Sequence, residues 1–533
     1  MRFALLVLML LPGLLSAAEI ETGDPALDAA FAQIMDDDFD IKAQGVDALV
    51  ASGHPKAVEL LNGLQDGSLR RYTRTDRLVW AIDGDAGYAI RDVFSGEDLG
   101  VESSRKVRKL PINNTVRGRI DAALASLDLN SPDPARRLAA VGAMLAKPDP
   151  AAIPQLRTLL ASETDPAVRA LTEIALAVSR LGNSDADERL AAVDALAGRL
   201  EPTVRNALQA TADHDADPAV REAAQHQLNL IQQQVDHYAL LETLFFGLSA
   251  GSVLVLAAIG LAITFGVMGV INMAHGELIM LGAYTTYLIQ QAMPSLPGLS
   301  LALAIPAAFV VSGLVGIAIE RGVIRFLYGR ALETLLATFG ISLILQQLVR
   351  TLISPQNVPV ENPEFMSGLW QINPVLSLTY NRLYIFVFSL IVFAALFMVL
   401  KKTRLGLEVR AVAQNRAMAR AMGVRSERVD ALTFGLGSGI AGVAGVALSQ
   451  LTNVGPNLGQ SYIVDSFMVV VFGGVGNLWG TLVAGLSLGV ANKILEPWSG
   501  AVLAKILVLV FIILFIQKRS RGLFPQKGRA AEG

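Results

Sequence analysis

Two kinds of hydrophobic pattern divide this chain. Between residues 19 and 236, alanine, valine and leucine recur at helical spacing among many acidic, basic and proline residues. From residue 237 to about 520, long apolar runs with few charges follow one another. Apolar runs of ~20 residues are typical of helices that cross a bilayer. The pattern predicts an all-α chain, in which a helical soluble domain (19–236) precedes a polytopic membrane helix bundle (237–520) and a short tail (521–533).

The first 18 residues have the features of a signal peptide. Arg2 gives a minimal positive start, residues 3–15 form an apolar core, and Ser16-Ala17-Ala18 supplies small residues before a cleavage point. An uncleaved anchor helix is the alternative, but the short core favours cleavage after Ala18. In either case we expect residues 19–236 on the exported side of the membrane, which in a bacterium is the periplasm.

The soluble domain repeats itself. Similar segments begin at Asp133 ("DPARRLAAVGAML"), Asp165, Asp185 and Asp217 ("DPAVREAAQHQLNL"), and a fainter copy begins at Asp38. Each has an aspartate where a helix cap belongs, and three of the four clear copies have proline in the first turn. Stacked helical units of this kind predict a HEAT-like α-solenoid, which either binds a partner protein or serves as a passive cap. Residues 72–100 interrupt the helical period, and their alternation and glycines predict a β-hairpin.

The membrane half contains nine apolar segments by our reading, and several are short or rich in glycine and proline, as expected of broken helices. Its positive residues gather in two loops, 321–330 and 401–428, and in the tail after Gln517. Because cytoplasmic loops carry excess positive charge, we expect all three in the cytoplasm. An exported N-terminus and a cytoplasmic C-terminus require an odd number of crossings, which nine satisfies. The segments are 239–262, 266–290, 300–319, 334–353, 383–400, 430–450, 462–476, 480–495 and 502–517.

The basic loop 404–432 has the features of a docking element. We expect one helix from Arg410 to Met422, with alanines along it, stopped by Gly423. A short helix with small side chains on one side can approach a cytoplasmic partner closely, whereas a merely solvated loop has no need of them. The candidate docking residues are Arg410, Ala411, Ala413, Asn415, Ala417, Ala421 and Gly423.

Composition excludes several functions. The chain has no cysteine, so disulfides, thiolate metal sites and cysteine nucleophiles are excluded, and its net charge of −3 gives no reason to expect nucleic acid. No phosphate-binding loop with its lysine occurs, so we expect no ATP or other cofactor in this chain and no enzymatic activity. The glycine-rich stretch "FGGVGNLWGTLVAG" at 472–485 predicts close helix packing. Its packing glycines are Gly473, Gly474, Gly476, Gly480 and Gly485.

Three polar residues stand in an apolar stretch of membrane-spanning length, "FGVMGVINMAHGELIMLGAYTTYL". Asn272, His275 and Glu277 are costly to bury in lipid, so they are expected to line a solute path or to clamp a broken helix through hydrogen bonds. Asn272 and His275 would share a face of a helix, and Glu277 would join them only if the helix breaks near Gly276. One histidine and one carboxylate are too few for a metal site.

Four stretches together resemble one known family. They are "GLSAGSVLVLAAIGLAITFGVMGVINMAHGELIMLGAY" (247–284), "ETLLATFGISLILQQ" (333–347), "GLEVRAVAQNRAMARAMGV" (406–424) and "VVVFGGVGNLWGTLVAG" (469–485). The chain resembles the LivH-type permeases of branched-chain amino acid ABC transporters. Met273 and the long exported extension make it look most similar to the permease subunit of urea transporters.

The resemblance implies an inner-membrane importer with several partners. These would be a second homologous permease, two cytoplasmic ATPases that dock on the 406–424 loop, and a periplasmic substrate-binding protein. Urea is the solute expected from the subtype, and branched-chain amino acids or short amides are the alternative. A membrane sensor and a stand-alone channel are further alternatives, although the tail is too short for a signalling domain and a channel needs no docking loop.

Overall fold

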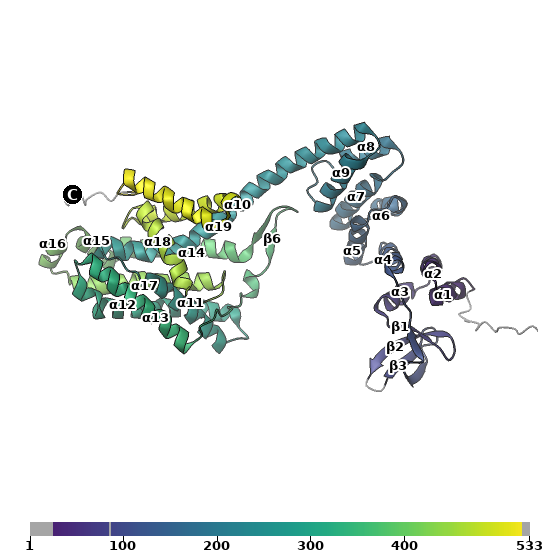
Figure 1. The fold of residues 1–533 in the computed structure, drawn as a ribbon, viewed down its shortest axis with the longest axis horizontal. Coiled ribbons are helices and arrows are strands. Elements are labelled where there is room, and N and C mark those ends of the chain that lie inside the picture. Colours follow the sequence, from purple (N-terminus) through teal and green to yellow (C-terminus); the bar gives the residue numbers. More distant parts are fainter. Residues whose placement is uncertain (1–24, 85–86, 525–533) are drawn as a thin grey trace, which may run out of the picture. The chain divides into compact units, whose positions relative to one another are not determined.

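The computed structural model describes residues 25–84 and 87–524, and the chain divides into two compact units, Met1–Gln232 and Gln233–Gly533. The expected signal peptide lies outside the described residues, and so do residues 525–533 of the expected tail. The described chain is mostly helical (Figure 1). The two units are described separately below.

The N-terminal unit begins with three helices, α1 (Pro25–Met35), α2 (Phe39–Ala51) and α3 (Ala57–Asp66), which share a core with α4 (Asn114–Asp128). A five-stranded antiparallel sheet follows α3, so the expectation of an all-α chain is wrong in this region. The expected hairpin is present as β2 and β3, but the sheet extends beyond residues 72–100. Its strands are β1 (Leu69–Tyr72), β2 (Arg77–Gly84), β3 (Gly87–Asp92), β4 (Asp98–Glu102) and β5 (Val107–Lys109), in the order β4-β3-β2-β1-β5.

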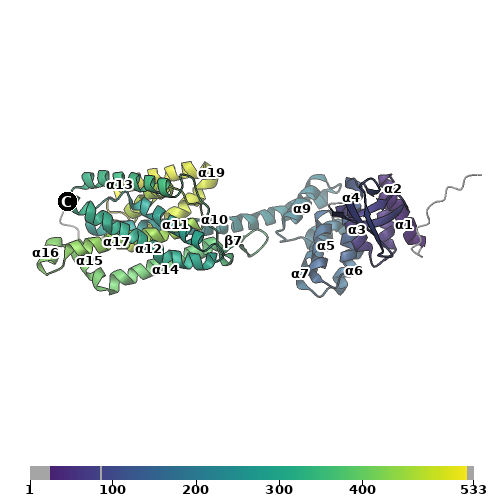
Figure 2. The ribbon, with the colours of Figure 1, turned by 90° about the horizontal axis from the view of Figure 1, so that it is seen from below.

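Three of the repeated segments form short helices that lie side by side with α6 and α9, and the one at Asp217 begins the long helix α10 (Figures 1 and 2). The aspartates that begin three of them, Asp133, Asp165 and Asp185, cap their helices by accepting backbone N–H groups. Apolar residues at helical spacing face inward in each helix, as in α7, where Val168, Ile174 and Val178 are buried. The helices are α5 (Pro134–Ala146), α6 (Ile153–Ser162), α7 (Pro166–Arg180), α8 (Ala186–Ala195) and α9 (Pro202–His214).

Each of the nine predicted apolar segments falls largely within a helix, although the number of crossings stays a prediction. Six helices of the described chain are long and apolar enough to cross a membrane: α10, α12, α13, α14, α17 and α19. Helix α19 contains a break at Gly500, whose φ of 77° is not helical. The elements are α10 (Pro218–Met268), α11 (His275–Ala292), α12 (Pro297–Gly322), α13 (Ala331–Leu352), α14 (Tyr380–Lys402), α17 (Ser426–Ser449), α18 (Leu458–Gly473) and α19 (Leu478–Lys518), with a small hairpin of β6 (Leu369–Gln371) and β7 (Ser377–Thr379).

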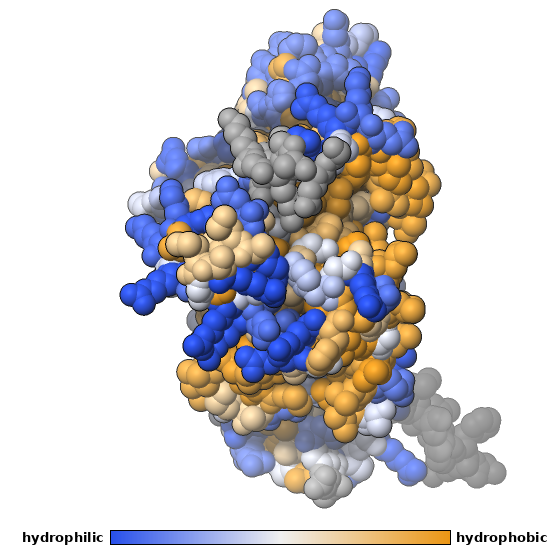
Figure 3. Space-filling view, turned by 90° about the vertical axis from the view of Figure 1, so that its left-hand side faces the viewer, coloured by the Kyte–Doolittle hydropathy of each residue, from blue (hydrophilic) through white to orange (hydrophobic). Residues whose placement is uncertain are grey.

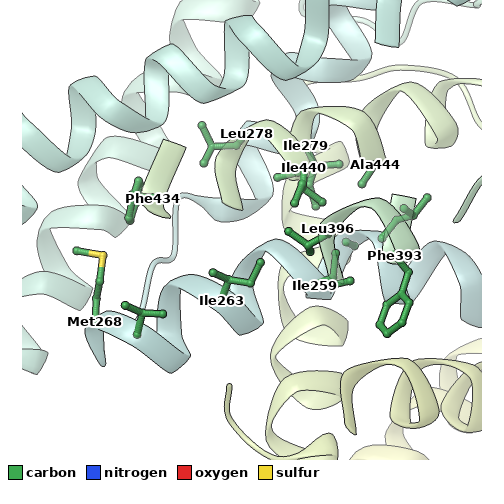
Figure 4. Close-up of a cluster of buried hydrophobic side chains, with 14 of the residues drawn as sticks. Ile259, Ile263, Met268, Leu278, Ile279, Phe393, Leu396, Phe434, Ile440 and Ala444 are labelled. Atoms are coloured by element: carbon green, nitrogen blue, oxygen red, sulfur yellow. The ribbon is translucent and has the colours of Figure 1, made fainter. Parts of the chain in front are cut away.

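Aliphatic and aromatic side chains from α10, α11, α14 and α17 form the core of the membrane unit (Figure 4). Ile259 and Ile263 of α10 lie among Leu278 and Ile279 of α11 and Ile440 of α17, and all are buried. Dispersion contacts of this density are the main attraction between helices in a membrane, where lipid is as apolar as the core. The core therefore holds the start of α11, with its polar residues, in a fixed place.

Candidate functional site: a buried polar seam between α11 and α13

The non-helical residues between α10 and α11 carry the first candidate residue. Helix α10 ends at Met268, and Gly269 follows with a φ of 66°, a backbone conformation that favours glycine. Asn272 lies in this break with 1% of its surface exposed, and its Oδ1 accepts the N–H of Ala274 at 3.0 Å. The expected shared helix face of Asn272 and His275 is therefore wrong, because only His275 belongs to a helix. The break also lies before Gly276, which is inside α11.

His275 faces α10. Its Nε2 lies 2.9 Å from the carbonyl oxygen of Ala257, and the side chain is fully buried. Its Nδ1 has no hydrogen-bond partner. A Cβ added to Gly260 of α10 would press on the imidazole ring, so the ring fills the space beside that glycine. This geometry is that of a hydrogen-bonded link between α10 and α11.

Glu277 faces α13 instead. Its Oε1 accepts hydrogen bonds from Ser342 Oγ at 3.0 Å and from Gln346 Nε2 at 2.7 Å, and only 1% of its surface is exposed. Its Oε2 has no partner. His275 and Glu277 are two positions apart on one helix, with only Gly276 between them, so they point to different neighbours. The structure thus does not bring the three candidates into a single cluster.

Sequence reasoning missed a polar stripe along α13. Thr338 Oγ1 accepts the N–H of Met273 in the break at 3.1 Å, and the side chain is fully buried. Residues at every fourth position share one helix face, and that spacing was the available signal in an otherwise apolar span. We call the contact between this stripe and the start of α11 the α11–α13 seam. The stripe consists of Thr334, Thr338, Ser342, Gln346 and Arg350.

One end of the seam is covered by two chain segments. Arg350 Nη2 donates to Asn457 Oδ1 at 2.7 Å, just before α18. Val358 and Val454 exchange two backbone hydrogen bonds of 2.8 and 2.9 Å. Gln290, near the end of α11, bonds the backbone of Glu361 as both donor and acceptor, at 2.9 and 2.8 Å. These bonds tie the segments after α13 and before α18 over that end of the seam.

The candidate docking loop forms two helices and not the single expected one. Helix α15 (Arg404–Gln414) ends at Gln414, and the side chain of the next residue, Asn415, caps α16 (Arg416–Ala421) by accepting the N–H of Met418 at 2.9 Å. Asparagine thus competes for the backbone and breaks the helix. Gly423, with a φ of 90°, ends α16 through bonds from its own N–H to Arg420 O and from Val424 N–H to Ala419 O.

The loop presents a mixed surface. Of the candidates, Ala411 and Ala413 are partly buried, while Arg410, Asn415, Ala417, Ala421 and Gly423 are exposed. Two methionines that sequence reasoning missed, Met418 and Met422, are 60% and 79% exposed. Hydrophilic residues gather on the side of the molecule that carries α15 and α16, and hydrophobic surface lies beside them (Figure 3). Arg416 anchors the loop, because its Nη2 donates to Asp430 Oδ1 of α17 at 2.9 Å.

The candidate packing glycines lie where backbones approach closely. Gly473 and Gly480 face one another across the turn between α18 and α19, and a Cβ on either would overlap the other's backbone. A Cβ on Gly485 would strike Val255 of α10. Gly476 lies against Gly266, and Gly474 lies against the carbonyl of Phe524. The turn between α18 and α19 is therefore tightly packed, also against α10.

The hollow of the N-terminal unit adds no functional group to the seam. A hollow of roughly 600 Å³, lined mainly by serine, threonine and amide side chains with Arg137 and Glu163, lies wholly within the N-terminal unit. Among the described residues there is no group of three or more histidine, aspartate or glutamate side chains that could hold a metal ion. The seam can therefore offer hydrogen bonds and two opposite charges.

The comparisons with known proteins concern the membrane unit. The family model described as the branched-chain amino acid transport system permease component matches residues 243–516. The permease protein BraD of the high-affinity branched-chain amino acid system of Pseudomonas aeruginosa is 32% identical over 54% of this chain and 96% of its own length. The corresponding LivH of Escherichia coli is 30% identical over 52% of this chain and 92% of its own. The ribose import permease protein RbsC of Escherichia coli is 25% identical over 52% and 85%. No solved structure matches.

Proposed function

Since the chain belongs to the family of branched-chain amino acid transport permeases, we propose that it is one of the membrane subunits of an ATP-driven importer for branched-chain amino acids. Permeases of this kind are not enzymes. The match over residues 243–516 carries the proposal, because it spans the whole helical region that contains the seam and the docking loop. The solute would cross along the α11–α13 seam, and His275 would hold α10 and α11 together beside it.

The partners and the orientation belong to the same proposal. ATPase subunits would grip α15 and α16 from the cytoplasm, a second permease would complete the pore, and a periplasmic protein would deliver the solute. The exposed basic residues Arg321, Arg325 and Arg330 support a cytoplasmic position for that loop. The N-terminal unit, with its HEAT-like repeats, would then lie in the periplasm of a bacterium, as the predicted signal peptide requires.

Urea is the second candidate solute. The methionine at 273 and the long N-terminal extension favour urea by resemblance. The α13 residues that contact the break or Glu277 are Thr338, Ser342 and Gln346, and all three are neutral hydrogen-bonding groups. The relatives reported above favour branched-chain amino acids.

Uptake decides between the two solutes. In a strain that lacks its own carriers, the complete transporter should take up labelled isoleucine and leave labelled urea outside. Urea uptake without isoleucine uptake would overturn the choice of solute. Ala417→Trp on α16 should abolish uptake at normal membrane abundance, because the bulky ring blocks a close approach. Ala161→Trp, at an exposed alanine of α6, is the matched control.

A further inference from the structure

Glu277 and Arg350 carry opposite charges and both lie on the α11–α13 seam, but they do not form an ion pair. Glu277 contacts the α13 stripe at Ser342 and Gln346. Arg350 is four residues beyond Gln346, which places it about 6 Å further along the same face of α13. No ion pair between Glu277 and Arg350 occurs among the described residues. The amide of Gln346 stands between them.

Each of the two charges keeps capacity for another partner. Glu277 Oε2 is buried and accepts no hydrogen bond. Arg350 donates to the amide oxygen of Asn457, which is a neutral acceptor. A carboxylate is a stronger acceptor for a guanidinium than an amide is, and a two-pronged contact adds geometric specificity. Both side chains would therefore make stronger hydrogen bonds if a charged solute were bound between them.

Two other buried acidic residues of the same unit are already paired with a basic side chain. Arg416 pairs with Asp430, and Asp465 of α18 pairs with Lys505 of α19 at 2.8 Å. A charge kept for stability alone is expected to be paired in this way, since an incompletely satisfied ion in a membrane unit is costly. Glu277 and Arg350 on the seam are not paired in this way, and Glu320 of α12 is a second buried carboxylate with an unpartnered oxygen.

We infer that Glu277 binds the ammonium group and Arg350 the carboxylate group of an α-amino acid in the path. An α-amino acid carries its two charges on groups bonded to the same carbon, so one molecule can bridge Glu277 and a guanidinium one helical turn beyond the residue that Glu277 contacts. Urea has no charge for either group to bind. This inference rests on the proposed function, and it assigns the selection of zwitterions to two residues. Because Arg350 also holds Asn457, an arriving carboxylate would release that bond and loosen the covered end of the seam.

The test is uptake of labelled isoleucine by the complete transporter in proteoliposomes, with ATP supplied to the ATPase side. Arg350→Gln and Glu277→Gln should each lower the uptake by roughly 10- to 100-fold, as expected when one member of a charged contact is lost. Arg350→Lys and Glu277→Asp keep the charge and should restore part of the uptake. Glu496→Gln in α19 and Arg382→Gln in α14 neutralise charges on helices other than α11 and α13 and serve as controls.

A second solute separates selectivity from damage. Isoleucinamide keeps the ammonium and lacks the carboxylate, so Arg350→Gln should lower isoleucine uptake relative to wild type far more than isoleucinamide uptake. An equal loss for both solutes, with no rescue by Arg350→Lys, would overturn the inference. If wild type carries isoleucine and both glutamine variants stay within twofold of it, the inference is overturned while the proposed function stands. If wild type carries urea and no isoleucine, the proposed function fails first.

Discussion

Two buried glutamates, Glu163 in the N-terminal unit and Glu277 in the membrane unit, are held in different ways. In the N-terminal unit, Glu163 receives hydrogen bonds from Arg137 Nε and Nη2 at 2.7 and 2.8 Å and from the backbone of Thr164 and Asp165. In the membrane unit, Glu277 receives two bonds on one oxygen and none on the other. A fully satisfied buried charge supports a fold, whereas a half-satisfied one has room for a ligand.

The N-terminal arrangement occurs twice, which strengthens this contrast. Arg189 binds Asp215 through two nitrogens at 2.8 and 2.9 Å, 26 residues apart in sequence, as Arg137 and Glu163 are. Each arginine also donates to the two carbonyls just before the aspartate that caps its helix. A contact repeated with the helical units belongs to their stacking. The seam in the membrane unit has no such repetition among the described residues.

The largest effect is expected at His275, which tests whether the membrane unit also contains purely structural polar groups. His275→Ala removes the bond to Ala257 and leaves a cavity beside Gly260, and large-to-small changes in a core cost roughly 3–5 kcal/mol. The purified transporter should unfold at a much lower temperature and accumulate poorly in the membrane. His275→Gln can place an amide nitrogen near the position of Nε2 and should recover part of the loss. If His275→Ala has normal stability but slow uptake, His275 acts in the solute path and not in stabilising the fold.

An intermediate effect is expected at Glu163 and depends on pH. The Arg137 guanidinium, with help from two backbone N–H groups, holds the pKa of Glu163 at about 2, below its ordinary value of 4.5. A lowered folded-state pKa means that the stabilisation is complete above about pH 4.5 and is lost as the pH falls towards 2. Hydrogen exchange of α5 and α6 in the full chain, corrected for intrinsic rates, should therefore accelerate across that range.

The same exchange measurement has an internal control. Glu163→Gln should speed exchange at neutral pH and remove most of the pH dependence that Glu163 causes. Glu173→Gln, at a largely exposed pair with Arg169 and Arg199, should have little effect. Protection that is unchanged in Glu163→Gln would show that the buried pair does not hold these helices together.

The smallest effect on stability is expected for Glu277→Gln. The amide oxygen can still accept the bonds from Ser342 and Gln346, and the cost of burying a charge with an unpartnered oxygen disappears. The unfolding temperature of the purified transporter should stay unchanged or rise slightly, within about 1 kcal/mol of wild type. A marked fall would mean that Glu277, like Glu163, serves the fold, and the contrast between the units would no longer hold.

The composition and the length of the apolar runs predicted which segments of the membrane unit are helical. Charged and strongly polar residues are rare in such runs, so they are easy to notice. Asn272, His275 and Glu277 were visible for that reason. Thr338, Ser342 and Gln346 were missed because neutral polar residues are ordinary in such helices until a partner is known. The break was misplaced because Gly269, and not Gly276, adopts the positive φ that ends α10. Asn415 was missed as a helix break because a helical period alone does not reveal a cap.

The five-stranded sheet shows a different limit. Strand β1 pairs with β5, as in the register of Arg70 with Lys109, and nearly 40 residues of other strands and turns lie between them. Local alternation can predict one hairpin, but it cannot predict a pairing over that separation. The sheet and the α11–α13 seam share this feature, since both are made by residues far apart in the chain.

The chain contains no cysteine, so a single introduced thiol reports on one place in the molecule. Ser342→Cys puts that thiol on the seam, beside Glu277, where the serine is buried in the structure. A water-soluble thiol reagent should label the complete transporter slowly at rest and much faster during ATP hydrolysis, and isoleucine should protect the site. Labelling that stays slow under ATP hydrolysis, or that isoleucine does not change, would contradict the claim that the solute crosses between α11 and α13.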